Sequence, residues 1–354
     1  MKTNHKFFLD LAFQIAEKNL GQTGQNPSVG SIVVKNNAVI SSGVTSKNGR
    51  PHAEYNALNK VKNTSGSSLY TSLEPCIHQG KTPPCTDIII KKKIKSVIFG
   101  TEDPDLRTFK KAKKILNSKG IKTKIIKSKK YNNFYRSYLI NKKFKIPFIS
   151  AKIAISKDYF TINKKEKWIT NIFSRRVSHL IRSKHDGIIS TSKSINFDNA
   201  LLNCRIQGFN KYKPDLFILD LNLNLKKKLL LNKIIKKRKS YLITYKTNIK
   251  KVQKYKKKGY RIIFINSLVN KNDFNLLLKK IYKMGYSRIL VESGLTFLNT
   301  LIKNNLINDL YIFNTNYNLK KKGKNNASLK YLKSIKSKQM LINLNSDKLH
   351  KKEF

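Results

Sequence analysis

The spacing of apolar residues in the first part of the chain changes between a helical period and a strand period. Phe8, Leu11, Ala12 and Ile15 recur on one helix face, which predicts a helix over residues 5–20. Two β-branched runs follow, and the two asparagines between them suit a tight hairpin turn. The predicted strands cover residues 29–35, 38–44, 69–73, 97–100 and 121–126, and the predicted helices cover 53–61, 86–92 and 108–119. This alternation predicts a three-layer α/β unit.

The second part of the chain repeats the alternation after a long amphipathic segment. Residues 128–146 carry Phe134, Tyr138 and Leu139 on one face, which predicts a single helix that links two domains. Strands are expected at residues 147–156, 187–190, 216–219, 241–244, 261–265, 288–291 and 310–313, with helices at 171–184, 273–284 and 295–303. After about residue 314 the chain is rich in Lys and Asn and shows no pattern. We therefore predict two α/β domains, residues 1–145 and 146–354.

The net charge of +55 raises the question of a polyanionic partner. The excess lysines run from Lys35 to Lys352 through every region, and no basic tract is interleaved with aromatic residues. This distribution favours a compositional bias, so we expect weak polyanion binding and no specific nucleic-acid partner. Such a surface still attracts phosphorylated small-molecule substrates.

Other features of the sequence indicate the compartment. No apolar run approaches the roughly 18 residues of a membrane span. The N-terminal segment carries Asp10 and Glu17, which a signal peptide would lack. Three cysteines, two of them in one short motif, favour a reducing compartment and a metal over disulfides. We therefore expect a cytoplasmic protein without a membrane partner, and homo-oligomerisation is left open.

The stretch from residue 52 to residue 85 holds the clearest chemistry. A hydrolytic zinc site uses three protein ligands and leaves one position for water, and His52, Cys76 and Cys85 supply three. Glu54 lies two residues after His52 at the start of a predicted helix, so we expect it to reach the water and not the metal. A closed structural site with His78 as the fourth ligand is the alternative.

These residues occur in an order that resembles the cytidine and deoxycytidylate deaminase superfamily. The resemblance is carried by HAE, by TSLEPCIHQGKTPPC and by NPSVG upstream. Eight residues separate Cys76 from Cys85. That gap, with its GKTPPC insert, is similar to the deaminase half of the bifunctional RibD family of riboflavin biosynthesis, whereas nucleic-acid deaminases have a C-x-x-C pair. The resemblance therefore implies a small phosphorylated pyrimidine as the substrate.

For this half, the resemblance assigns a role to each motif residue. The implied roles are Zn²⁺ binding by His52, Cys76 and Cys85, proton transfer by Glu54, pyrimidine binding by Asn26 and Ala53, and phosphate binding by Lys81. Two positions depart from the family pattern. Thr45 stands where the family has His, and the loop after Asp103 lacks the family's glycines.

The second half shows scattered signals, each of which is weak alone. They are the single Trp168, Arg182 on a predicted helix, Asp198 and Arg205 flanking a loop, and a strand that ends in Val-Glu-Ser-Gly. A glycine turn between a strand and a helix is a natural place for a phosphate. Taken together and in this order, they resemble the reductase half of the same family, which is similar in fold to dihydrofolate reductase.

This second resemblance implies a substrate site and an NADPH site. The implied substrate contacts are Arg182, Leu202, Arg205 and Glu292. The implied NADPH contacts are Ala154, Trp168, Ser194, Asp198 and the run Gly294, Leu295, Thr296, Phe297, Leu298, Asn299 and Thr300. Five positions depart from the family pattern, namely Tyr159, Glu166, Asn199, Ala200 and Leu221.

The expected fold is a cytidine-deaminase-like three-layer α/β/α domain followed by a dihydrofolate-reductase-like α/β domain. The expected function is bifunctional. Zinc-dependent deamination of 2,5-diamino-6-ribosylamino-4(3H)-pyrimidinone 5′-phosphate would be followed by NADPH-dependent reduction of the ribosyl group. Two alternatives stay open: a deaminase with a degenerate reductase-like domain, and a deaminase associated with nucleic acid.

Overall fold

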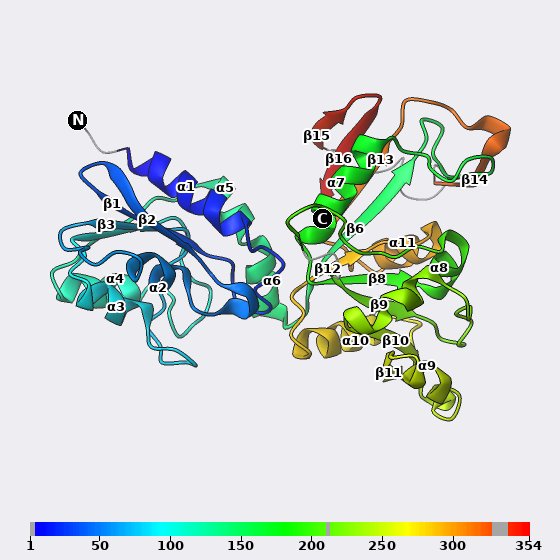
Figure 1. Cartoon of the computed structure of the whole chain (residues 1–354), viewed down its shortest axis with the longest axis horizontal. Coiled ribbons are helices and arrows are strands. Elements are labelled where there is room, and N and C mark those ends of the chain that lie inside the picture. The colour runs from blue at the N-terminus through cyan, green and yellow to red at the C-terminus, as the bar shows by residue number, and fades with distance from the viewer. Residues whose placement is uncertain (1–3, 210–212, 328–338) are drawn as a thin grey trace. The chain divides into compact units, whose positions relative to one another are not determined.

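The computed structural model describes residues 4–209, 213–327 and 339–354. The chain divides into two compact units, Met1–Lys145 and Ile146–Phe354 (Figure 1). The helices of the first unit are α1 (His5–Glu17), α2 (Ala53–Leu58), α3 (Cys85–Lys91), α4 (Ala112–Ser118), α5 (Lys129–Phe134) and α6 (Arg136–Phe144). Its strands are β1 (Gly30–Lys35), β2 (Ala38–Val44), β3 (Ser68–Thr71), β4 (Ser96–Phe99) and β5 (Lys122–Ile125).

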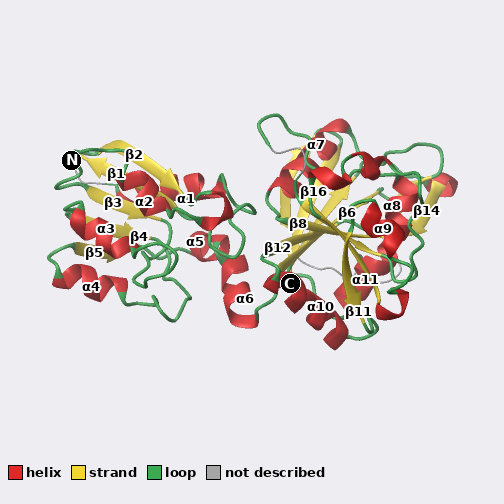
Figure 2. Ribbon diagram, turned by 60° about the horizontal axis from the view of Figure 1, so that its bottom comes forward, coloured by secondary structure: helices red, strands yellow, loops and turns green. Residues whose placement is uncertain are grey.

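The first unit is a sheet covered on both faces by helices. The strand order is β2-β1-β3-β4-β5, antiparallel among the first three strands and parallel from β3 onwards. Residues that alternate along a strand separate to opposite faces. Ile32 and Tyr70 pack with α1, α5 and α6, whereas their neighbours Val33 and Leu69 pack with α2, α3 and α4. The predicted three-layer arrangement is therefore present (Figure 2).

The predicted hairpin turn between β1 and β2 is also present. Asn36 and Asn37 have φ values of 51° and 59°. A type I′ turn needs φ above zero at both central residues, and asparagine tolerates that conformation better than most residues do. This two-residue turn pairs Lys35 with Ala38 and so sets the register next to it.

The prediction of a single helix over residues 128–146 is wrong, because the segment is divided at Tyr135 into α5 and α6. Tyr135 is buried, and its hydroxyl lies 2.6 Å from Ser72 Oγ and donates to the Ser28 carbonyl at 3.2 Å. Those contacts with distant segments turn the backbone to φ −90° and ψ 5°. Tertiary packing thus overrides the local helical pattern.

The second unit is built on a larger sheet. Its strands are β6 (Phe148–Ile155), β7 (Phe160–Asn163), β8 (Gly187–Thr191), β9 (Asp215–Leu219), β10 (Ser240–Tyr245), β11 (Arg261–Ile265), β12 (Arg288–Val291), β13 (Asp309–Asn314), β14 (Gly323–Asn326), β15 (Gln339–Leu344) and β16 (Asp347–Glu353). Its α-helices are α7 (Ile172–Ser183), α8 (Ser192–Asp198), α9 (Gln253–Lys257), α10 (Lys271–Lys283) and α11 (Leu295–Lys303). The order of the large sheet is β11-β10-β9-β8-β12-β6-β13-β16-β15.

This sheet has helices on both faces and an antiparallel edge. All strands from β11 to β13 are parallel, and β16 and β15 are antiparallel additions beyond β13. Helices α10 and α11 pack on one face, and α7, α8 and α9 pack on the other. The antiparallel strands come from the Lys- and Asn-rich tail in which the sequence showed no pattern. No described helix is both long and apolar enough to cross a bilayer.

Candidate active sites

Three ligand atoms converge at the N-terminal ends of α2 and α3. His52 directly precedes α2, Cys85 begins α3, and Cys76 lies in the loop after β3. His52 Nδ1 is 3.5 Å from Cys76 Sγ and 3.4 Å from Cys85 Sγ. Tetrahedral zinc with usual bond lengths would place such N and S atoms about 3.6 Å apart. The donor set and its spacing therefore fit Zn²⁺ bound through Nδ1, with all three atoms within 4.8 Å of one another.

The alternative fourth ligand lies elsewhere. His78 Nδ1 is 3.2 Å from Thr108 Oγ1, and His78 is not a member of the cluster formed by the other three. Among the described residues the site thus has three protein ligands, which is the number that a catalytic zinc site uses.

Three groups of this cluster have shifted pKa values. Contacts from Cys85 and His52 lower the pKa of Cys76 to about 4 against the effect of burial. Cys85 is buried beside the Cys76 sulfur, and its pKa is raised. Glu54, in the first turn of α2, is 3% exposed, and burial raises its pKa to about 7. A group with that pKa can both accept and release a proton near neutral pH.

The residues implied in substrate binding differ in their burial and in their contacts. Ala53 is the first residue of α2 and is fully buried, and Asn26 Nδ2 donates to the Gly49 carbonyl at 3.4 Å. Lys81 is exposed in the loop between the two cysteines. Thr45, which stands at the family's His position, is buried and bonds the backbone of Val29, so it takes no part in a substrate surface.

Arg50 lies two residues before His52 and belongs to none of the motifs recognised in the sequence. Its Nη1 donates to Thr82 Oγ1 at 2.5 Å. A side chain on Gly80 would place its Cβ 3.2 Å from Arg50 Nη2. The guanidinium therefore reaches both neighbours of Lys81, and no described carboxylate forms an ion pair with it.

The loop that lacks the family's glycines is held by Glu74. Its carboxylate accepts hydrogen bonds from the backbone N–H groups of Asp103, Lys110 and Ala112, each at 3.1 Å. The residue before Pro75 and Cys76 thus organises the loop over residues 103–112. The sequence did not indicate this role.

In the second unit, the centre of the candidate site is the carboxylate of Glu292. It follows β12, which lies between β8 and β6 in the sheet. Arg182 Nε donates to Glu292 Oε1 at 2.6 Å and Arg182 Nη2 donates to Oε2 at 2.9 Å. Lys152 of β6 forms an ion pair with Oε2 at 3.2 Å. Burial opposes the charge of Glu292, but Arg182 and Lys152 outweigh it, and its pKa is lowered.

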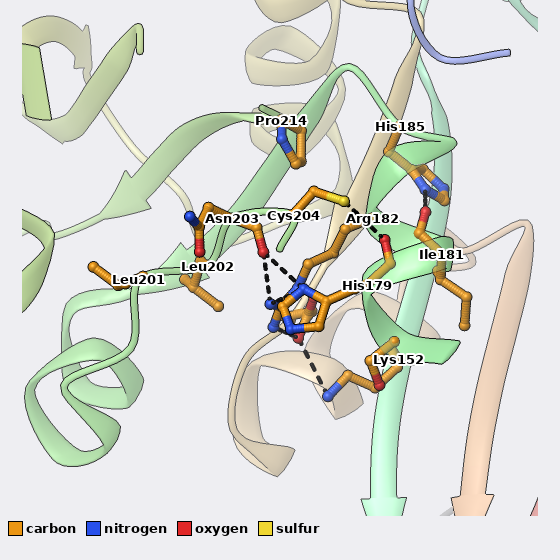
Figure 3. Close-up of polar contacts among 12 residues, drawn as sticks. Lys152, His179, Ile181, Arg182, His185, Leu201, Leu202, Asn203, Cys204 and Pro214 are labelled. Atoms are coloured by element: carbon orange, nitrogen blue, oxygen red, sulfur yellow. Dashed lines mark hydrogen bonds and ion pairs between the residues drawn. The ribbon is translucent and has the colours of Figure 1, made fainter. Parts of the chain in front are cut away.

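A second layer of contacts joins Arg182 to the loop over residues 199–205 (Figure 3). Arg182 Nη1 donates to the Asn203 carbonyl at 2.9 Å. The Arg205 backbone N–H lies 3.2 Å from His179 Nδ1. Burial, with Arg182 and Arg205 nearby, lowers the pKa of His179 to about 4, so the ring is neutral and Nδ1 can accept that bond. The Arg205 side chain is exposed, and Leu202 is buried.

Two of the implied NADPH contacts, Ser194 and Gly294, meet at the start of α11. The Gly294 N–H donates to Ser194 Oγ at 2.8 Å, and Gly294 immediately precedes that helix. Trp168 is half exposed, with Arg175 5.2 Å from its ring centroid. Exposed backbone at a helix start and a flat ring flanked by cations suit an anionic dinucleotide. Along the run 294–300, Gly294 and Thr296 are exposed, whereas Leu298 packs in the core.

The five positions that depart from the family pattern in this unit differ in their surroundings. Tyr159 has φ 68°, a left-handed conformation in which glycine is favoured. Asn199 has φ 46° at the end of α8, where asparagine is well tolerated. The Leu221 carbonyl accepts bonds from Thr244 and Asn248. Ala200 packs against the core, and Glu166 is exposed.

Comparisons with known proteins find relatives for both units. Residues 2–101 match the model of the cytidine and deoxycytidylate deaminase zinc-binding region, and residues 147–315 match that of the RibD C-terminal domain. The riboflavin biosynthesis protein RibD of Aquifex aeolicus is 31% identical over 87% of this chain and 86% of its own length. The chain belongs to the RibD family.

RibD proteins of known structure share the whole fold. RibD of Acinetobacter baumannii superposes with a TM-score of 0.82 at 24% identity, covering 98% of both chains. The deaminase and reductase from Thermotoga maritima gives 0.80 at 24% identity, covering 98% of this chain and 97% of that one. The predicted fold class is confirmed, as are the assignments of zinc and NADPH and of a bifunctional deaminase and reductase of riboflavin biosynthesis.

Proposed function

We propose that His52, Cys76, Cys85 and Glu54 form the centre that deaminates 2,5-diamino-6-ribosylamino-4(3H)-pyrimidinone 5′-phosphate. The observation that carries this proposal is one nitrogen and two sulfurs at the spacing of a tetrahedral zinc site, next to a buried carboxyl group. Zn²⁺ held there would supply an activated water at neutral pH. Glu54 takes one proton from that water and delivers it to the ring nitrogen. It then moves the proton of the added hydroxyl group to the amino group, which leaves as ammonia.

The substrate phosphate is bound by Lys81 together with Arg50. Both cations belong to the same surface, because the Arg50 guanidinium donates to Thr82 and lies beside Gly80, the two neighbours of Lys81. Arginine adds a planar set of donors to the single charge of lysine, which suits a phosphate. Asn26 and the backbone at Ala53 orient the pyrimidine above the metal ligands.

A pair of substrates tests this phosphate site. Arg50→Gln and Lys81→Met should each raise the deaminase KM about 10-fold for the phosphorylated substrate, a loss of about 1.4 kcal/mol. Neither variant should change the KM for the dephosphorylated nucleoside. An equal rise for both substrates would mean that the two residues act on the loop and not on the phosphate. Lys47→Met, at an exposed lysine just before the motif, is the matched control.

We propose that the second unit reduces the ribosyl group of the deaminated product at C1′. NADPH bound near Gly294, Ser194 and Trp168 would supply the hydride. Arg205 and Arg182 face the ribose phosphate, and Arg205 is the more available, because three nitrogens of Arg182 already have partners within the protein. Leu202 and Glu292 complete the substrate surface, and Ala154 and Asp198 border the cofactor.

One preparation of the pure protein tests both halves. We expect about one zinc per chain, ammonia release from the diaminopyrimidine substrate, and NADPH oxidation with the deaminated product. Ammonia release without NADPH oxidation would contradict the reductase assignment and favour a degenerate second unit.

We propose a small molecule, and no nucleic acid, as the partner of this basic surface. Any binding of DNA or RNA should then disappear near 150 mM salt, as expected for contacts that depend on counterion release alone. Binding that persists and displaces the pyrimidine substrate would favour a nucleic-acid deaminase. Three free cysteines are consistent with a cytoplasmic location.

A further inference from the structure

Arg238 belongs to none of the motifs, yet its guanidinium is buried against three backbone carbonyls, two of them in the loop over residues 199–205. It precedes β10 and is 7% exposed. Its Nη1 donates to the carbonyls of Leu202 at 2.7 Å and Pro214 at 3.1 Å, and its Nη2 donates to the carbonyl of Leu201 at 2.5 Å. No described carboxylate forms an ion pair with it. Burying a charge without an ion pair costs free energy. The hydrogen bonds of Arg238 to the three carbonyls offset part of that cost and connect it to the loop over residues 199–205.

These contacts hold one side of the loop over residues 199–205. Figure 3 labels Leu201, Leu202 and Pro214, whose carbonyls accept these bonds. The other side of the same loop meets Arg182 through the Asn203 carbonyl and His179 through the Arg205 N–H. Leu202, between the two sides, has φ 48°. A branched side chain rarely adopts that conformation unless surrounding contacts impose it. Arg238 supplies such contacts, because it bonds the carbonyls of Leu201 and Leu202.

The composition of the chain supports the choice of arginine at this place. Of the 74 cationic residues, 10 are arginines, so lysine fills most positions where any cation would serve. Lysine carries one nitrogen, whereas the planar guanidinium can address several carbonyls at fixed angles. Three carbonyls from two segments are bonded here, a task that a lysine cannot perform in the same geometry.

We propose that Arg238 is a positioning residue of the reductase. It fixes the conformation of the loop over residues 199–205 and thereby places Arg205 and the Asn203 carbonyl relative to Arg182. The inference rests on the proposed function, in which Leu202 and Arg205 contact the substrate. Arg238 itself touches neither substrate nor cofactor.

Arg238→Lys tests the proposal on the full chain. The reductase KM for the deaminated substrate should rise at least about 10-fold, because the displaced loop binds the substrate poorly. The deaminase kcat/KM should be unchanged in the same protein, which provides an internal control. Arg261→Lys, the same change at an exposed arginine of β11, should leave both activities as they are.

A merely structural role would give a different result. It would lower the fraction of folded reductase and so reduce the apparent kcat, while KM stayed at the wild-type value. That outcome, with hydrogen exchange of the loop at the wild-type rate, would overturn the proposal. Arg238→Ala should regain a low KM when methylguanidinium is added and should not respond to methylammonium, and rescue by both compounds would also contradict the proposal.

Hydrogen exchange separates this proposal from the proposed function. Arg238→Lys should increase exchange at residues 203–206 and leave exchange in α10 unchanged. Faster loop exchange without any change in KM would mean that Arg238 holds the loop but the loop does not bind this substrate, so the proposed substrate site fails. Unchanged exchange would overturn the role of Arg238 whatever the activity.

Discussion

The two sites of this protein are assembled in different ways. The zinc ligands and Glu54 come from one stretch, and two of the ligands stand at the start of short helices. The reductase cluster collects Lys152, Arg182, Asn203 and Glu292 from segments far apart in the sequence. The first site needs little more than a local loop and two helices. The second exists only when β8, β12 and β6 lie side by side.

This difference decides how strongly each site depends on the rest of the fold. A local site keeps its donors close together in the sequence, so its ligand spacing can be recognised directly. A distributed site joins charges that are remote in the sequence, and their mutual neutralisation then becomes part of the stability of the domain. We therefore expect changes in the first site to affect chemistry and changes in the second to affect both chemistry and folding.

The largest effect should follow from Glu54→Gln. General acid–base groups contribute about 10²- to 10⁴-fold to rate, so ammonia release should fall by about that factor. Zinc content should stay near one per chain, because Glu54 is not among the three ligands. Reduction of the deaminated substrate should be unaffected. Metal analysis and the two assays on one preparation provide the measurement.

Asp87→Asn is the control for Glu54→Gln, since it makes the same kind of change at an exposed carboxylate in the first turn of α3. It should leave deamination at the wild-type rate. Undiminished ammonia release in Glu54→Gln would remove Glu54 from the mechanism and would weaken the view that the first site is local and complete.

The second effect concerns the stability of the distributed site. Glu292→Gln leaves Arg182 and Lys152 without their shared countercharge, and breaking a buried pair on one side costs about 3–5 kcal/mol. Trp168 is the single tryptophan and lies in the second unit, so its fluorescence during urea unfolding reports that unit alone. Reductase activity should be lost, and deaminase activity should remain.

Glu353→Gln is the matched change for the second unit. Glu353 pairs with Lys351 on β16, but its side chain is 49% exposed. An exposed pair contributes about 0–1 kcal/mol, so this variant should unfold almost as the wild type does. If Glu292→Gln were no less stable than Glu353→Gln, the reductase cluster would not be a stabilising element and the contrast between the two sites would fail.

The same contrast explains what could be predicted from the sequence. Strand and helix periodicity, the hairpin at Asn36 and Asn37, and the zinc motif are local, and the structure has all three. The break at Tyr135 depends on Ser28 and Ser72, which no local pattern reveals. Strand β16 is polar and lysine-rich, so its sequence lacks the apolar pattern that predicts a strand. It is held by backbone pairing with β13.

Arg50 and Arg238 were missed for a related reason. Neither belongs to a motif, and in a chain with 74 cationic residues an additional positive charge carries little information. The useful signal was the type of cation, because arginine is rare in this chain. Arg50, Arg182 and Arg238 each place at least two guanidinium nitrogens next to different neighbours. The single nitrogen of a lysine could not do this in the same geometry.

The smallest effect concerns two neighbouring groups with opposite dependence on pH. Burial lowers the pKa of His185 from 6.5 to about 3, so acid favours its unfolded form and stability falls as pH drops below 6.5. Desolvation raises the pKa of Asp186 from 3.8 to about 7, so its contribution is present below 3.8 and is lost as pH rises through 7. Between about pH 5 and 6.5 the two contributions cancel.

Asp186→Asn removes one side of this balance. The unfolding free energy of the second unit should then depend more steeply on pH than in the wild type, by about 1.4 kcal/mol per pH unit between about pH 5 and 6.5. Ser287→Ala removes a hydroxyl that donates to Asp186 at 2.9 Å without removing a titrating group. It should lower stability by about 1 kcal/mol at each pH and keep the wild-type slope. Trp168 fluorescence during unfolding at several pH values gives the slope for each protein. Equal slopes in all three proteins would show that Asp186 is ionised in the folded unit and that burial does not raise its pKa.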